Sequence, residues 1–300
     1  MKINRAHLAA IIAFSMWGLF PIYWKYFSEV DAWDLFGHRL LWSFVTLFFI
    51  MLFRKKLNLV RDIWKDPKKR LMLVISALLI SSNWLLYIYA VNIGRVLEAS
   101  MGYFLNPLIN VFMGWILLKE KIRPTQWPAI VLALISMVLL AINTDLAHFP
   151  WIALILSLTF AMYGLIRKLV HVGSMEGLLF ETAVVIIPVL VYWNFRATSP
   201  LTVFHELPLN KNLVLTLSGL VTSIPLILFA YSAKRLSLQT LGMIQYLSPS
   251  FKFLCGLFLF HEALSSEKLQ AFGLIWVALA WYTVESFHYS RRSTVKVTNE

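Results

Sequence analysis

The chain has 300 residues, of which 59% are hydrophobic and only 14% are charged. An ordinary soluble domain is about 25% charged, so this chain has too little polar surface to fold as a soluble globular protein. Ten apolar segments of about 20 residues each, the length that spans a bilayer, would leave room for connections but not for a separate soluble domain. The net charge of +12 does not indicate a nucleic-acid partner, because the basic residues lie in the gaps between apolar segments rather than on one folded surface.

Long apolar runs, bounded by charged or turn-forming residues, predict ten transmembrane helices. The first run is longer than the apolar region of a signal peptide and lacks a small-x-small cleavage site, so we expect it to be retained as a helix. The predicted helices cover residues 7–27, 33–53, 71–91, 97–118, 125–142, 150–170, 178–195, 212–233, 238–260 and 268–288.

The distribution of Lys and Arg among alternate connections predicts the orientation. Twenty of the 27 basic residues belong to the termini and connections of one side, whereas five belong to the other side. The segment from Arg54 to Arg70 contributes most to this difference. Since cytoplasmic loops carry the excess of Lys and Arg, we expect both termini in the cytoplasm, and the same basic loop is suited to contact anionic lipids.

An internal repeat relates the two halves of the chain. The segment 14–19 recurs as 160–165, and Leu-Asn-Pro at 105–107 recurs as Leu-Ser-Pro at 247–249, at offsets of 146 and 142 residues. Each half would hold five helices, so the second half would enter the membrane from the opposite side. We therefore expect an all-α integral membrane protein of two inverted five-helix repeats, residues 1–145 and 146–300. Exchanging the packings of two such halves exposes a central site to either side in turn, which is typical of transporters.

Two cations lie inside predicted spans. Lys252 falls about 12 Å from the nearer end of its helix at 1.5 Å per residue, where an ammonium disfavours insertion by about 2.5–3.5 kcal/mol. It indicates either a site for an anionic or carboxylate-bearing solute or a buried structural ion pair. Arg39, preceded by His38, lies nearer the end of its helix, where it either anchors the helix at the interface or binds a carboxylate in the cavity.

Two carboxylates are candidates for proton coupling. Glu98 and Glu181 lie near the ends of the fourth and seventh predicted spans. A carboxyl group in a partly dry cavity can alternate between its charged and neutral forms. The alternative for each is a first-turn carboxylate that complements the helix dipole.

Polar and helix-breaking residues near the middle of several spans predict a cavity wall. Pro107 and Pro249 occupy equivalent positions of the repeat, where a missing N–H and a ring clash kink or break a helix. The accompanying candidates for substrate contact are Asn83, Trp84, Tyr103, Asn106, Asn110, Gln245 and Tyr246. Each aromatic residue among them also has an ordinary packing role as its alternative.

Enzyme motifs do not account for these residues. The sequence lacks a Walker A loop, His-Glu-x-x-His and Gly-x-Ser-x-Gly, so ATP-driven transport by this chain and the corresponding enzyme classes are not expected. The single cysteine, Cys255, cannot form an intrachain disulfide or, alone, a zinc site. We expect no cofactor and no metal.

Several segments in register resemble the bacterial RarD-type permeases of the EamA branch of the drug/metabolite transporter superfamily. The resemblance runs from about residue 7 to 290, although Lys252 has no charged counterpart in the family pattern. The segments that carry it are His38–Ser43, Asn83–Leu86, Leu97–Phe104, Asn106–Leu108, Tyr163–Leu165 with Arg167 and Lys168, Glu181–Thr182, Leu241–Gly242, Gln245–Tyr246, Pro249 and Ile275–Ala280.

The resemblance implies ten helices in two inverted repeats, a bacterial cytoplasmic (inner) membrane location and secondary transport of small metabolites, with export common among relatives. We expect an exporter of small polar metabolites, such as amino acids or related compounds, that works by alternating access as a monomer or homodimer in contact with membrane lipids. Protons or the solute gradient would supply the energy. The alternatives are a lipid-headgroup flippase or scramblase and a multidrug exporter.

Overall fold

The computed structural model describes residues 4–93, 95–142, 151–195, 200–259 and 266–297, and within these residues the chain is helical and contains no strand. The helices are α1 (Arg5–Lys25), α2 (Ala32–Phe53), α3 (Leu57–Lys65), α4 (Pro67–Asn92), α5 (Val96–Leu117), the 3-10 helix η1 (Pro124–Gln126), α6 (Trp127–Ile142), α7 (Trp151–Leu169), α8 (Ser174–Phe195), α9 (Pro200–Glu206), α10 (Leu209–Thr216), α11 (Ser218–Ala233), α12 (Leu238–Gln245), α13 (Leu247–Phe258) and α14 (Ser266–Val297).

The predicted all-α class is confirmed, and the helices suit a membrane protein. Six described segments, one of them α10 continued by α11, are long and apolar enough to cross a bilayer, and two more apolar helices are shorter. Large apolar side chains such as Phe53, Phe195 and Phe258 are exposed on the surface, as expected where the surroundings are lipid rather than water.

The basic segment 54–70 was expected to be a loop, but it contains α3, whose Ile63 is buried while Trp64 is exposed.

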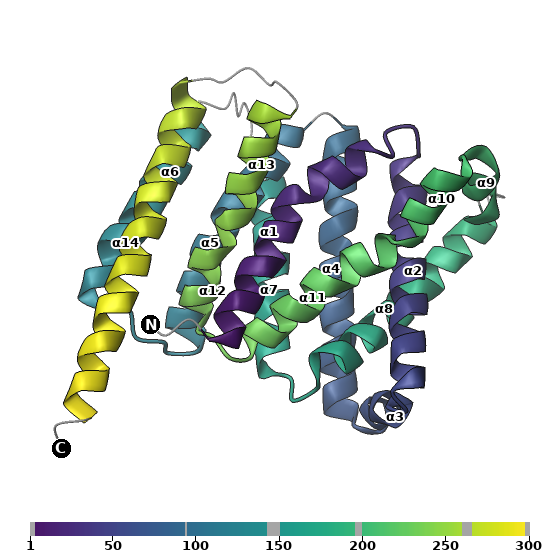
Figure 1. Ribbon diagram of the computed structural model, residues 1–300, viewed down its shortest axis with the longest axis horizontal. Coiled ribbons are helices and arrows are strands. Elements are labelled where there is room, and N and C mark those ends of the chain that lie inside the picture. Colours follow the sequence, from purple (N-terminus) through teal and green to yellow (C-terminus); the bar gives the residue numbers. More distant parts are fainter. Residues whose placement is uncertain (1–3, 94, 143–150, 196–199, 260–265, 298–300) are drawn as a thin grey trace.

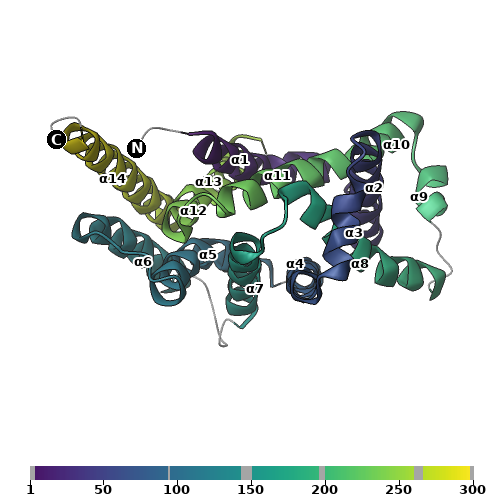
Figure 2. The same cartoon turned by 90° about the horizontal axis from the view of Figure 1, so that it is seen from below.

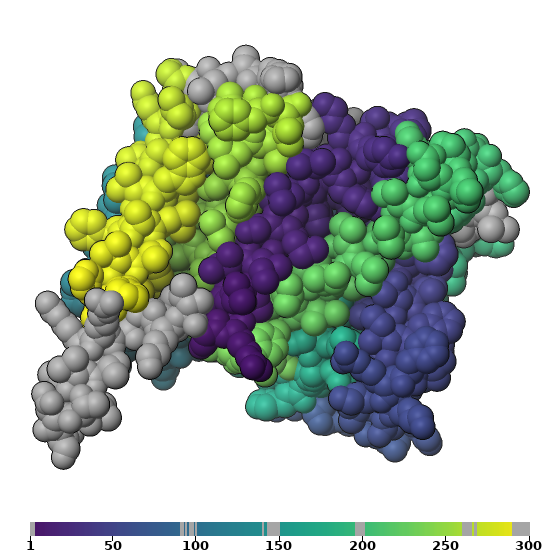
Figure 3. All heavy atoms as spheres, in the orientation of Figure 1, coloured from purple at the N-terminus to yellow at the C-terminus, as the bar shows by residue number. Residues whose placement is uncertain are grey.

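The helices form two layers that each combine both halves of the sequence (Figure 2). One layer contains α14, α12 with α13, α1, α11 and α2, and the other contains α6, α5, α7, α4 and α8. In the first layer α1 packs against α11 and α13, whereas in the second α7 packs against α4 and α5. On the face seen in Figure 3, α1 and α11 lie side by side. The first half of the sequence is therefore interleaved with the second.

The beginning of α1 and the end of α14 lie at the same end of the molecule as α3 (Figure 1). We call this end the α3 end.

Local capping fixes the starts of two helices at the α3 end. Asn4 Oδ1 accepts hydrogen bonds from the backbone N–H groups of Ala6 (2.9 Å) and His7 (3.2 Å) at the start of α1. Asp66 accepts from the N–H of Lys69 (3.1 Å) at the start of α4, and this bond, together with the Lys69 ammonium, holds the pKa of Asp66 below its usual value.

The helices α5 and α12 cross closely. A Cβ atom added to Gly242 of α12 would lie 2.6 Å from the carbonyl oxygen of Pro107 and 3.1 Å from Cβ of Asn110, both on α5. Only glycine allows this approach. α5 continues through Pro107, whereas the ninth predicted span is divided at Tyr246, three residues before Pro249.

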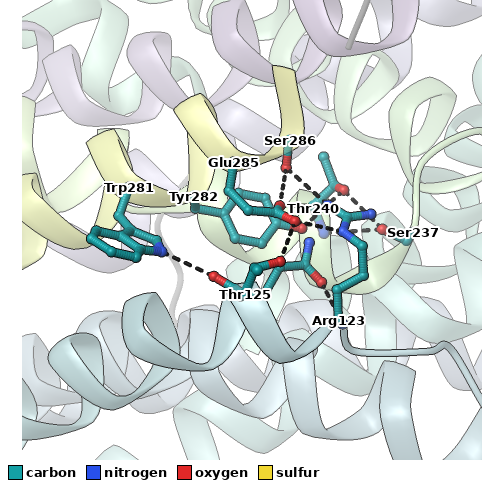
Figure 4. A network of polar contacts seen from close by, with 9 residues as sticks. Arg123, Thr125, Ser237, Thr240, Trp281, Tyr282, Glu285 and Ser286 are labelled. Atoms are coloured by element: carbon teal, nitrogen blue, oxygen red, sulfur yellow. Dashed lines mark hydrogen bonds and ion pairs between the residues drawn. The ribbon is translucent and has the colours of Figure 1, made fainter. Parts of the chain in front are cut away.

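A polar network ties α14 to the connection between α5 and α6 (Figure 4). The Arg123 guanidinium donates from Nε to Glu285 Oε1 (2.7 Å) and from Nη2 to Oε2 (2.6 Å). Thr125 donates to the same carboxylate (2.7 Å), and Trp281 Nε1 donates to the Thr125 carbonyl (2.9 Å). A bidentate pair of this kind is stronger than a neutral hydrogen bond, so it should hold α14 in place.

Replacing Arg123 with Ala should therefore lower the free energy of unfolding by about 1.5–3 kcal/mol, the range for hydrogen bonds to charged groups. The measurement is the thermal unfolding midpoint of the purified protein in detergent. Lys65→Ala is the control, because the Lys65–Asp62 pair is exposed (64% and 60% of the side chains) and such pairs contribute little. Equal midpoints for the two variants would contradict the role assigned to Arg123.

Candidate functional site

A cavity of about 340 Å³ lies in the half of the molecule away from the α3 end. This volume is typical of a small-molecule site. Residues of α1, α2, α4, α5, α7, α11, α12 and α13 line it, and it reaches Trp24 near the end of α1 and Ala32 at the start of α2. We call it the central cavity.

Arg39 lies in the wall of the central cavity between two tryptophan rings. Its guanidinium carbon is 4.7 Å from the ring centroid of Trp24 and 4.8 Å from that of Trp84. Its Nε donates to Oγ1 of Thr222 (3.3 Å). The aromatic faces stabilise the cation without neutralising it. Among the described residues, Arg39 has no carboxylate partner.

Lys252 of α13 also lines the central cavity. Its Nζ is 3.7 Å from the ring centroid of Tyr103, and no carboxylate in the described part of the chain forms an ion pair with it. The two cations therefore face one space from different helices, α2 and α13. A cavity with two cations and no paired carboxylate is suited to an anion.

Side-chain amides complete the polar part of the wall. Asn83 Nδ2 donates to the Leu156 carbonyl (2.6 Å) and to Thr159 (2.9 Å), which fixes its orientation. Asn106 is 3% exposed, and its Oδ1 has no hydrogen-bond partner among the described residues. Gln245 is held by Asn110, whose Nδ2 donates to Gln245 Oε1 (2.8 Å). Asn106 Oδ1 is thus a buried acceptor without a partner in the described part of the chain.

The structure brings eight of the predicted site residues together and separates the others. Those that line the central cavity are Arg39, Asn83, Trp84, Tyr103, Asn106, Gln245, Pro249 and Lys252. Asn110 lies behind Gln245, and Tyr246 packs against α5 and α14, with its hydroxyl donating to the Phe104 carbonyl (3.4 Å). Pro107 is at the α5–α12 crossing.

The remaining predicted residues lie elsewhere. His38 is fully buried against the rings of Trp193 and Phe204. Glu181 forms a buried ion pair with Arg167, with 3.3 Å between Arg167 Nη1 and Glu181 Oε1, outside the central cavity. The side chain of Glu98 lies outside the described residues, although its backbone belongs to α5.

Aromatic rings that were not among the predicted site residues line one part of the central cavity, which we call the aromatic floor. Phe14, Trp17 and Phe160 line it, and Phe229 packs beneath them, 5.4 Å from Phe160 and 5.6 Å from Trp17 between ring centroids. Phe14 and Trp17 belong to the first copy of the repeated motif, and Phe160 begins the second. The internal repeat singles out these residues in the sequence. It did not indicate that both copies of the motif would line the same part of the cavity.

Polar contacts close the molecule on the other side of this floor. The Glu120 carboxylate accepts from the N–H groups of Leu238 (2.9 Å) and Gln239 (3.2 Å) at the start of α12. Lys168 of α7 lies 3.6 Å from the same carboxylate and donates to the Leu236 carbonyl. These contacts, which we call the α12 latch, join α5, α7 and α12 at the α3 end.

The arrangement is suited to binding rather than to bond-breaking chemistry. Cations, amides and aromatic rings line the central cavity, so it can hold a small solute that has both a negative group and an apolar body. Within the described residues, no three His, Cys, Asp or Glu side chains are grouped so that they could hold a metal ion.

Comparison with known proteins identifies the family. Residues 4–142 match the EamA-like transporter family. The protein RarD of Escherichia coli is 38% identical over 287 residues, 96% of each chain, and an uncharacterized transporter of Pseudomonas aeruginosa is 40% identical over 293 residues, 97% of each chain. A crystal structure at 18% identity shares the fold, with a TM-score of 0.72 over 93% of this chain and 97% of the other. The chain belongs to the RarD-type group of the EamA-like transporter family.

Proposed function

We propose that the protein is a secondary carrier that moves a small anionic or zwitterionic metabolite, such as an amino acid or a related compound, by alternating access. The observation that carries the proposal is the pair of cations, Arg39 and Lys252, on the wall of one cavity without a carboxylate partner among the described residues. A charge inside a membrane protein is costly unless a partner compensates it. A bound anion would supply that partner.

The proposed ten-span architecture has two inverted repeats, residues 1–145 and 146–300. Helix contacts support it, because they keep their pattern when the halves are exchanged. The contacts of α1 with α11 and α13 correspond to those of α7 with α4 and α5, and the contact of α2 with α11 corresponds to that of α8 with α4. Two related packings of similar energy are what alternating access requires.

We place the α3 end in the cytoplasm of a bacterium, with the protein in the cytoplasmic membrane. Support comes from the basic residues of segment 54–70, which contains α3, together with the excess of Lys and Arg expected on that side. In this orientation the central cavity faces outward, while the aromatic floor and the α12 latch close the inward path. Export, a monomeric or dimeric state and proton coupling are further parts of the proposal.

Replacing Arg39 with Ala should abolish transport and leave a folded protein in the membrane. The assay begins with a thermal-shift screen of amino acids and of aliphatic and aromatic carboxylates. Any compound that stabilises the wild type is then tested in proteoliposomes. We expect binding to weaken at least about tenfold in the variant, equivalent to about 1.4 kcal/mol. Arg54→Ala, in the exposed loop after α2, is the matched control.

Full transport by Arg39→Ala would remove this residue from the site. Movement of labelled lipid by the wild type, without movement of any small solute, would instead favour the flippase or scramblase alternative.

Access to the central cavity provides a second test. On a Cys255→Ser background, Ser248→Cys in the cavity wall should react with a membrane-impermeant thiol reagent added on the side opposite the α3 end. The rate should be about tenfold higher than from the α3 side, which corresponds to a free-energy difference of about 1.4 kcal/mol between access states. Ser157→Cys, which is fully buried and does not line the central cavity, should be unreactive from both sides. Preferential reaction of position 248 from the α3 side would contradict the proposed outward-facing state.

A further inference from the structure

A second, smaller cavity lies beside Glu181, and it shares some of its wall residues with the central cavity. Its volume is about 20 Å³, which is enough for one water molecule. Ile80, Trp84 and Leu226 belong to the walls of both cavities. We call it the Glu181 chamber. Carbon atoms form nearly all of its surface, and the residues with polar side chains that border it are Ser43, Ser81, Tyr163, Glu181, Thr182, Thr222 and Ser223.

Several polar atoms of the Glu181 chamber are buried without a partner. Glu181 Oε1 accepts from Ser76 Oγ (2.6 Å) and from Arg167 Nη1 (3.3 Å). In contrast, Glu181 Oε2, the Tyr163 hydroxyl and Ser223 Oγ have no hydrogen-bond partner among the described residues. Glu181 and Ser223 are each 2% exposed and Tyr163 is fully buried. Because unsatisfied buried groups are costly, these atoms indicate a place for a water molecule or a proton.

Glu181 is the one carboxylate among the described residues that line the chamber. Arg167 of α7 faces it and is fixed by a second bond, from Nη2 to the Ser174 carbonyl (3.0 Å). Lys234, after the end of α11, is the next charge that interacts with Glu181, and Lys234 also interacts with Glu176 of α8. The groups contributed by α2 and α4, Ser43, Ser76 and Ser81, are neutral hydroxyls.

Arg167 also depends on the close approach of α8. A Cβ atom added to Gly177 would lie 3.0 Å from Cζ of Arg167, so glycine leaves the space that the guanidinium occupies. The cation is thereby held next to Glu181 by backbone geometry as well as by hydrogen bonds. Arg167 is fully buried beside this carboxylate.

Thr222 connects the Glu181 chamber to the central cavity. Its side chain lines the chamber, and its Oγ1 accepts the hydrogen bond from Arg39 Nε (3.3 Å). An anion that binds the guanidinium of Arg39 competes with this bond. When the bond breaks, the Thr222 hydroxyl is free to turn toward the chamber, where it can donate to water or to the carboxylate. Thr222 thus joins Arg39 in the central cavity to the Glu181 chamber.

We propose that the Glu181 chamber is a proton-binding site, and that Thr222 couples its occupancy to Arg39 in the central cavity. A proton that arrives on a water molecule in the chamber adds to Oε2 of Glu181, and the new O–H donates to the oxygen of that water molecule. On release, the proton returns to water and the carboxylate again accepts hydrogen bonds. The proposed proton site does not depend on the proposed carrier function. Its coupling to a bound solute rests on that function.

Infrared spectroscopy of the full-length protein in lipid membranes tests the proposal without a transported solute. The carbonyl-stretch band of a protonated carboxyl group is followed as the pH is lowered. Part of this band should be lost in Glu181→Gln and retained in Glu176→Gln, a matched control on the same helix. Loss of the same intensity in both variants, or in neither, would overturn the assignment.

Two further variants report on the surroundings of the carboxylate. Ser76→Ala removes a donor to the charged form, so the titration midpoint of the Glu181 band should rise by about half a pH unit or more. Thr222→Val should also raise it, because the chamber loses a hydroxyl that can donate to water or to the charged carboxylate. If Glu181→Gln fails to fold, the Ser76→Ala shift decides whether the band belongs to Glu181, and an unchanged midpoint would reject that assignment.

The outcomes separate this inference from the carrier proposal. A Glu181 band that shifts in Thr222→Val supports the coupled proton site even if no tested solute is transported. A midpoint that is unchanged in Thr222→Val overturns the coupling, and transport that depends on Arg39 would then leave the carrier proposal intact.

Discussion

The structure depends on one constraint, which is that a charge inside a membrane protein must be compensated within the protein or face a polar space. Arg167 and Glu181 satisfy it by pairing with each other in a fully buried site. Arg39 and Lys252 satisfy it differently, since they lie against aromatic rings and face a cavity. The aromatic faces lower the cost of the two cations but do not neutralise them, and in the proposed function a negatively charged solute would do so.

The two ends of the molecule are built differently. The central cavity is lined by Phe14, Trp17 and Phe160, whereas the α12 latch at the α3 end consists of contacts of Glu120 and Lys168. The two layers combine helices from both halves of the sequence (Figure 2). In alternating access, the moving units would therefore be helix groups such as α1 with α11 and α13 rather than the first and second halves of the chain.

Apolar run length predicted most helices within a few residues, because about 20 residues are needed to span a bilayer. It did not predict α3 and α9, which are too short for that criterion, or the division of α12 from α13. Arg39 and Lys252 were accessible to prediction because charge is rare within such helices. His38, Asn110 and Tyr246 were expected in the cavity but lie behind its wall. An apolar helix has no polar face from which the direction of a side chain can be inferred, so contacts across more than a hundred residues decided these positions.

The most direct test of the central claim is to measure distances at both ends of the same protein by pulsed electron paramagnetic resonance. On a Cys255→Ser background, one pair of spin labels is attached through Ala32→Cys and Tyr89→Cys, beside the central cavity, and another through Lys121→Cys and Arg235→Cys, beside the α12 latch. Weakening the latch with Glu120→Gln should lengthen the second distance and shorten the first, because one end closes as the other opens. Distances that stay unchanged at the cavity end while the latch end opens, or that lengthen together, would contradict alternating access about the central cavity.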